Sequence, residues 1–405
     1  MRSILDTLLD DARLIARDKR CRRLLLFVFC LDAPFAFVFL IALQNYFTPQ
    51  QLEGRAVPGL ALALFAAGKL ALQYQGGRVT DRLGSRRALS LGLACIATAL
   101  ATLLAASALP ALVLFASLLY GAGSACAWPA VLGQAHAMPA SVRGALTAAM
   151  TAATGAGVVV ALTLGFVLPD NLPFRLAILL ALGAIVLTLK LSLDAERDLE
   201  GAVLPRGPHS FGLRAILAQP AYVALGGAFM LQSLAAAAIV ANFRAVGRDL
   251  MGVSLQRETV LLLPAGACFA LGVLLAGVLV RLSRRACLAS GLMLSGASFL
   301  AVSHASGQLP QAALIASGCA GLGLGAPAMT ALSLDMARTA PGLLFGYLFA
   351  LEGVGHMAGP LLTAGLADVR LSLALIGGVL VAASMLALQV RQVAEPALEL
   401  VADAP

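Results

Sequence analysis

Long apolar segments alternate with short polar ones along almost the whole chain. Each apolar segment contains about 20 residues, the length at which an α-helix crosses the hydrocarbon core of a bilayer. We predict twelve membrane-spanning helices, at residues 24–46, 57–76, 88–108, 110–133, 142–168, 173–191, 219–242, 258–280, 286–306, 310–334, 341–364 and 369–390. The pattern therefore indicates an all-α integral membrane protein.

The composition agrees with lipid as the main solvent of the chain. Hydrophobic residues make up 60% of the 405 residues and charged residues 12%, whereas soluble globular chains carry roughly 25% charged residues. The net charge of +8 does not indicate nucleic-acid binding, because Lys and Arg cluster in the loops between the apolar segments. The seven cysteines are scattered without metal-ligand spacing, and the sequence has no catalytic acid pair and no nucleotide-binding loop. We therefore expect no cofactor, no metal site and no enzyme.

The distribution of Lys and Arg predicts the orientation in the membrane. With the N-terminus inside, the inner segments hold 21 of these residues and the outer segments 6, while Lys69 lies within a predicted span. Cytoplasmic loops are enriched in positive residues, so we expect both termini in the cytoplasm and the chain in the cell (inner) membrane. Apolar residues in 1–23 recur at helical spacing, which fits an amphipathic helix on the membrane surface or a helical cytoplasmic tail.

The longest polar stretch, residues 192–214, divides the chain into two halves. We expect six-helix bundles at 24–191 and 215–390, with cytoplasmic segments at 1–23, 192–214 and 391–405. The halves resemble each other at an offset of 198 residues. The matching pairs are Arg86 and Arg284, Arg87 and Arg285, Gly123 and Gly321, Pro129 and Pro327, Gly144 and Gly342, Gly155 and Gly353, and Gly157 and Gly355. Parallel repeats around a mid-membrane site are common in secondary transporters, so the two bundles are expected to be pseudo-symmetric.

The loop after the second predicted helix reads Gly77-Arg78-Val79-Thr80-Asp81-Arg82-Leu83-Gly84-Ser85-Arg86-Arg87. It resembles the G-x-x-x-D-R-x-G-x-R-R signature of the major facilitator superfamily at every defining position. The resemblance implies the twelve-helix fold of that superfamily, and that Asp81 meets the start of the eleventh helix near Pro341 and shuts the cytoplasmic side. In the alternative reading, the arginines of the loop only set topology. The expected cytoplasmic gate consists of Gly77, Asp81, Arg82, Gly84, Arg86, Arg87 and Asp335.

Two departures from the family pattern bear on function. The equivalent loop of the second half, around 277–285, lacks the aspartate, so the gate is expected to be asymmetric. Members that export drugs against protons often carry an arginine where this chain has Ser117, and a G-x-x-x-G-P motif in the fifth helix, which is absent here. Both differences weaken a standard drug–proton antiporter reading without excluding export.

Three charged residues fall at similar depth near the membrane midplane: Asp32, Lys69 and Glu352. Charges there destabilise a membrane helix, so they are functional candidates. Lys69 has two candidate partners, Asp32 and Glu352. The pair either biases the conformational equilibrium and couples it to protons or is a fixed structural ion pair, and the third alternative is no contact. His356 lies one turn beyond Glu352 and is interpreted as a proton relay or as a helix-packing residue.

Aromatic and polar residues near the same depth predict a cavity for amphipathic or weakly polar solutes. The candidates are Phe35, Phe39, Tyr120, Gln232 and Phe349. Trp128 is expected in the aromatic belt near the cytoplasmic surface, and His136 near a helix end at the membrane interface.

The sequence thus favours a monomeric secondary active transporter in the lipid bilayer. It would move a small solute by alternating access, driven by protons, with export as the expected direction. Nutrient or metabolite uptake by symport or facilitated diffusion is the first alternative, and a membrane sensor without transport is another.

Overall fold

The computed structural model describes residues 4–43, 56–105, 109–167, 174–197, 213–246, 258–337, 341–364 and 368–390, together with Leu250 and Leu366. These residues form helices and short connections, with no strand among them. The helices are α1 (Ile4–Arg17), α2 (Lys19–Phe35), η1 (Ala36–Ala42), α4 (Ala56–Leu83), α5 (Ser85–Ala105), α6 (Pro110–His136), α7 (Ala140–Val167), α8 (Phe174–Arg197), α9 (Leu213–Leu217), α10 (Pro220–Ala245), α11 (Glu258–Leu279), α12 (Arg284–His304), α13 (Gln308–Met336), α14 (Pro341–Ala364) and α15 (Val369–Gln389). The all-α prediction is confirmed.

The predicted spans correspond in order to α2 with η1, then α4 to α8, then α10 to α15. By length and composition alone, eight helices of the described part are apolar enough to cross a membrane: α5, α6, α7, α8, α10, α12, α13 and α15. Of the other four, α11 is apolar over Pro264–Leu279. The remaining three, α2 with η1, α4 and α14, carry the midplane charges Asp32, Lys69 and Glu352. The helices that supply the charges of the candidate site are therefore not among these eight.

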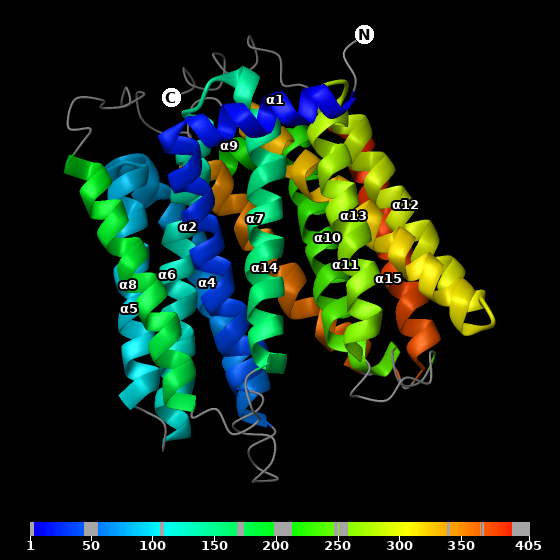
Figure 1. Ribbon diagram of the computed structural model, residues 1–405, viewed down its shortest axis with the longest axis horizontal. Coiled ribbons are helices and arrows are strands. Elements are labelled where there is room, and N and C mark those ends of the chain that lie inside the picture. The colour runs from blue at the N-terminus through cyan, green and yellow to red at the C-terminus, as the bar shows by residue number, and fades with distance from the viewer. Residues whose placement is uncertain are drawn as a thin grey trace.

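The helices form two bundles side by side (Figure 1). In the N-terminal half, α4 and α5 pack on α6, α8 packs on α5, and α2 packs on α7. In the C-terminal half, α11 and α12 pack on α13, α15 packs on α12, and α10 packs on α14. The halves meet where α4 and α6 contact α14 and where α7 contacts α11 and α13. This arrangement is the pseudo-symmetric pair of six-helix bundles that the sequence repeat predicts.

Glycine contacts repeat between the two halves. In the first half, a Cβ added to Gly157 of α7 would lie 3.2 Å from the carbonyl oxygen of Phe29 in α2. In the second half, a Cβ on Gly355 of α14 would clash with the carbonyl oxygen of Met230 in α10. Small residues let membrane helices approach closely, so the same close crossing of the first and fifth helix is built into each half.

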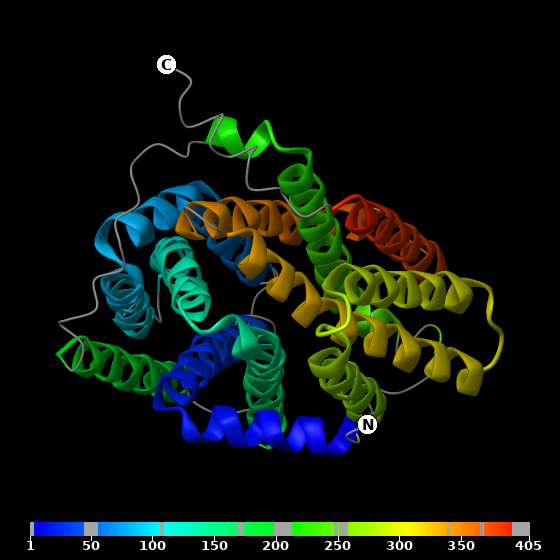
Figure 2. The same cartoon turned by 90° about the horizontal axis from the view of Figure 1, so that it is seen from above.

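Helix α1 lies across one end of both bundles, as Figures 1 and 2 show from two directions. It contacts α2 and α7 of the N-terminal half and α11 of the C-terminal half. Ile15 of α1 is buried against the bundles, whereas Arg13 and Arg17 of the same helix are exposed. The end of the molecule that carries α1 is called the α1 face below, and the other end the opposite face.

Parts of the predicted domain division lie outside the described residues. These are most of the central loop, 198–212, and the tail at 391–405. The boundaries assigned to those segments stay predictions.

Candidate functional site

An ion pair joins the two halves near the middle of the bundle. Lys69 Nζ of α4 lies 2.9 Å from Glu352 Oε2 of α14, and the two side chains are 9% and 19% exposed. The Lys69 ammonium also lies 5.3 Å from the ring centroid of Phe349, within range of a cation–π interaction. The sequence predicted either Asp32 or Glu352 as the partner of Lys69, and Glu352 is the residue that contacts it. Whether the pair acts in coupling or only in structure stays a prediction.

The close crossing of α4 and α14 makes this ion pair possible. Gly77 of α4 faces Gly342 and Gly346 of α14 so closely that an added Cβ would collide with the Gly342 backbone and lie 3.2 Å from the Gly346 Cα. Lys69 precedes Gly77 by eight residues, which is about 12 Å of helix. The glycines thus bring α4 and α14 together near the α1 face. The ion pair lies in the same helix contact, closer to the middle of the bundle.

Asp81 connects the end of α4 to the start of α14. Its carboxylate accepts hydrogen bonds from the backbone N–H groups of Gly342 (2.9 Å) and Leu343 (2.8 Å). The first N–H groups of a helix have no partner within the helix, and a negative charge there is stabilising. Asp81 therefore has the contact that the family resemblance implies, whereas its action as a gate stays a prediction.

The other predicted gate residues surround this contact. Gly84 adopts a φ of 87°, which lets the chain turn sharply from α4 into α5. Arg82 and Arg87 are exposed, and Arg86 is half-buried. Asp335 pairs with Arg284 of α12, so within the described residues its contact lies inside the C-terminal half.

His136 forms another link between the halves near the α1 face. Its Nδ1 atom lies 3.0 Å from the carbonyl oxygen of Leu334 in α13. The sequence placed His136 at the membrane interface, but its ring is partly buried against the other half. The contacts of Asp81 and His136 hold both sides of the junction together at the α1 face.

Asp32 lies beside the ion pair, on α2. Thr154 Oγ1 of α7 donates a hydrogen bond of 2.6 Å to Asp32 Oδ2. Lys69 and Glu352 are the charged residues whose electric fields act on this carboxylate. Pro34 follows two residues later, and the helix continues in the π-helical turns of η1. Asp32 is half-buried, and its charge has no cation in direct contact among the described residues.

Four aromatic rings pack together next to Asp32, on the side towards the opposite face. Phe35 lies 4.6 Å from Phe65 and 5.2 Å from Phe39 between ring centroids, and Tyr120 lies 5.2 Å from Phe39. Phe39 and Tyr120 are fully buried, while Phe35 and Phe65 are partly accessible. Phe65 was not among the residues predicted to line the cavity, although it lies one turn before Lys69 on α4 and could have been included for that reason.

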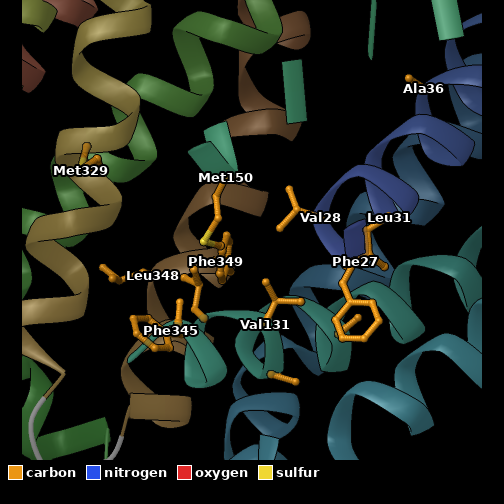
Figure 3. Packing of buried hydrophobic residues seen from close by; sticks show 14 of the residues in the cluster. Phe27, Val28, Leu31, Ala36, Val131, Met150, Met329, Phe345, Leu348 and Phe349 are labelled. Carbon is orange, nitrogen blue, oxygen red and sulfur yellow. The ribbon is translucent and has the colours of Figure 1, made fainter. Parts of the chain in front are cut away.

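A second aromatic group lies on the α1 side of the ion pair. Phe349 of α14 lies 5.9 Å from both Trp128 of α6 and Phe229 of α10 between ring centroids. Trp128 therefore contacts the other half, two turns before the end of α6 at His136, and its place in an aromatic belt near the cytoplasmic surface stays a prediction. Phe349 belongs to the buried cluster in Figure 3, which includes Phe27, Val28, Val131, Met150, Met329, Phe345 and Leu348 from both halves.

His356 and Gln232 complete the predicted set. His356 follows Glu352 by one turn on α14, is exposed, and lies in the electric fields of Glu352 and Lys69. Gln232 of α10 is half-buried. Relay and cavity roles for these residues stay predictions.

Gln73 is a polar residue of the α4–α14 contact that the sequence analysis missed. It lies one turn from both Lys69 and Gly77, it is fully buried, and its backbone faces Gly346. Neither atom of its amide has a hydrogen-bond partner within the described part of the chain. Unpaired buried polar groups are destabilising by about 1–3 kcal/mol each, so Gln73 destabilises the contact between α4 and α14.

We expect Gln73→Leu to stabilise the contact between α4 and α14, because leucine removes the unpaired amide and keeps a similar volume. Thermal unfolding in detergent should shift upwards by a few degrees, and solute flux should slow because the two helices separate less readily. Gln75→Leu is the matched control, since Gln75 is exposed on the same helix. An unchanged or lower unfolding temperature for Gln73→Leu would contradict this prediction.

The fold and the site together define a multi-pass membrane protein with two pseudo-symmetric halves and a charged, aromatic centre between them. The family model described as Major Facilitator Superfamily matches residues 24–281. The chain belongs to this superfamily, whose members are transporters, and it is a membrane transporter of a solute.

Solved structures agree on the fold. The human organic anion transporter MFSD10 (TETRAN) is 18% identical with a TM-score of 0.73, covering 92% of this chain and 100% of that one. The transporter FucP in its outward conformation is 14% identical with a TM-score of 0.74, covering 94% and 100%. A variant of the E. coli fucose:proton symporter FucP is also 14% identical with a TM-score of 0.74, covering 92% and 98%. Among curated proteins, none matches this sequence significantly.

Proposed function

We propose that the protein is a secondary active transporter that exports its solute and is driven by protons, with Asp32 as the group that binds the proton. One observation carries this proposal. Asp32 is a half-buried carboxylate whose direct contact is the neutral hydroxyl of Thr154, beside an ion pair that joins the two halves. A carboxylate in that position changes the charge balance of the junction when it is protonated.

The ion pair supplies a physical route from protonation to conformation. Opening the α1 face separates α4 from α14 and therefore breaks the contact between Lys69 and Glu352. Asp32 is in the same half as Lys69, so an ionised Asp32 can replace Glu352 as its partner. A protonated Asp32 is neutral and cannot form an ion pair with Lys69. Ionised Asp32 thus lowers the free energy of the state with an open α1 face, and protonation favours the closed state.

We further propose that the α1 face lies in the cytoplasm. The helix ends and connections on this side contain most of the Lys and Arg residues, including Arg78, Arg82, Arg281 and Arg285. Such residues are retained on the cytoplasmic side during insertion. The contacts of Asp81 and His136 then belong to a closed cytoplasmic gate, and the cell (inner) membrane is the expected location.

Uptake of a nutrient by symport is the second candidate. It is supported by the absence of the fifth-helix G-x-x-x-G-P motif, since α7 reads Thr154-Gly155-Ala156-Gly157-Val158-Val159 at that place. The two candidates predict opposite directions of solute movement under the same proton gradient.

We expect Asp32→Asn to abolish the dependence of transport on the proton gradient. Asparagine keeps the size of the side chain and removes the titrating group, so the variant should behave as if permanently protonated. The measurement is flux of a solute panel in proteoliposomes with an imposed pH gradient. Wild-type protein should concentrate at least one solute when the gradient is present, and the variant should not.

Thr154→Val is the control for this experiment, because it removes the hydrogen bond to Asp32 but leaves the carboxylate. Its flux should still depend on the gradient. The proposal fails if the flux of an identified solute depends equally on the gradient in wild type and Asp32→Asn.

A further inference from the structure

The charges of the site do not sum to zero. Lys69 and Glu352 form a direct ion pair and neutralise each other. Asp32 is close enough to feel both residues, but its direct contact is an uncharged hydroxyl. With His356 neutral, the site therefore carries one net negative charge whenever Asp32 is ionised. A single positive charge would balance it.

The wall beside this carboxylate is aromatic. Phe35 lies three residues after Asp32 on the same helix, and its ring is 4.6 Å from that of Phe65 on α4. Both rings are partly accessible, whereas Phe39 and Tyr120 behind them are buried. Aromatic faces attract cations and also accept large apolar groups. The surface next to Asp32 thus suits an apolar body that carries a positive charge.

A buried hydroxyl in this wall has no partner. The Tyr120 hydroxyl forms no hydrogen bond within the described residues, and the charge of Asp32 acts on it. Buried hydroxyls without partners are rare and destabilising. The Tyr120 hydroxyl therefore adds an unpaired polar group to the surroundings of Asp32, behind the two accessible rings.

We propose that the substrate is a monovalent organic cation with a bulky apolar body, whose charge is held by Asp32 and whose body lies against Phe35 and Phe65. This inference rests on the proposed function, because it assigns the substrate to the same carboxylate that binds the proton. A carboxylate that holds a proton has no charge left for a cation, so proton and substrate exclude each other. Under an inward proton gradient, such exchange moves the cation outwards.

The test uses two ions of the same shape and opposite charge, tetraphenylphosphonium and tetraphenylborate. Binding to purified protein in nanodiscs is measured by equilibrium titration, with quenching of Trp128, the single tryptophan, as a second readout. Wild type should bind the cation more tightly than the borate, and more weakly at about pH 5.5 than at about pH 8, because protons compete with the cation for the Asp32 carboxylate. Asp32→Asn should weaken cation binding by at least about tenfold and leave the borate unchanged.

Asp32→Glu is the control for Asp32→Asn, because it also changes the side chain but keeps the negative charge. Asp32→Glu should retain the preference for the cation, which would show that the weaker binding by Asp32→Asn is caused by the lost charge and not by misfolding. The inference is overturned if the borate binds wild type more tightly than the phosphonium ion, or if Asp32→Asn leaves phosphonium binding unchanged. Loss of gradient-driven flux in Asp32→Asn together with unselective ion binding would refute the substrate class alone. Gradient-driven flux that survives in Asp32→Asn would refute the proposed proton site instead.

Discussion

Glu352→Gln is expected to open the α1 face and to stop gradient-driven transport. The substitution leaves the ammonium of Lys69 in a mostly buried position without its partner 2.9 Å away. Removing one member of a buried ion pair is destabilising by roughly 3–5 kcal/mol. Because Asp32 remains available in the N-terminal half, Lys69 is expected to turn towards it, which favours the state in which α4 and α14 have separated.

The distance across the α1 face measures this effect. Spin labels at Leu83, at the end of α4, and at Leu282, after α11, lie on exposed residues of the two halves. In a background without native cysteines, Glu352→Gln should lengthen their separation. Lys69→Met combined with Glu352→Gln removes both charges and should restore the closed distance, since replacing a whole buried pair is often neutral or stabilising. The same short distance in wild type and Glu352→Gln would contradict this role of the pair.

Gly77→Ala is expected to prevent the closed α1 face altogether. A Cβ at this position would overlap the backbone of Gly342, so the helices themselves must move apart. Overpacking costs typically 1–3 kcal/mol even where side chains can adjust, and here the obstacle is backbone. Separation at this crossing also withdraws Asp81 from the start of α14 and Lys69 from Glu352.

Solute flux and the Leu83–Leu282 distance should both report the defect of Gly77→Ala, with flux lost and the distance increased. Gly183→Ala is the matched control, because Gly183 lies on α8 of the same half and an added Cβ there meets nothing within 4 Å. The control should transport normally, and its fold should be equally or slightly more stable because alanine is the better helix former. Normal flux in Gly77→Ala would show that this crossing does not have to close.

Much of the fold was predictable from the sequence, because its main determinants are local. The twelve apolar segments reflect the thickness of a bilayer, and the glycines at a fixed offset reflect a repeated pattern of helix crossings. Asp81 could be assigned to the start of α14 because a loop motif and an unsatisfied helix N-terminus are both visible in the sequence.

The site was less predictable, because hydropathy gives the depth of a residue but not the neighbour it faces. Asp32 and Glu352 are at similar depth, so the sequence left the partner of Lys69 open. The choice of Glu352 depends on the rotation of α14 at its crossing with α4, which the glycines set. Phe65, Gln73 and the inward position of Trp128 depend on the same kind of packing.

The central claim is that the two faces open alternately about the contact between α4 and α14. It is tested most directly by measuring two spin-label distances under the same conditions: Leu83 to Leu282 across the α1 face, and Leu109 to Leu309 across the opposite face, all on exposed residues. The account predicts that Glu352→Gln lengthens the first distance and shortens the second relative to wild type. If both distances lengthen together, or if only one of them changes, the two halves do not move as alternating access requires.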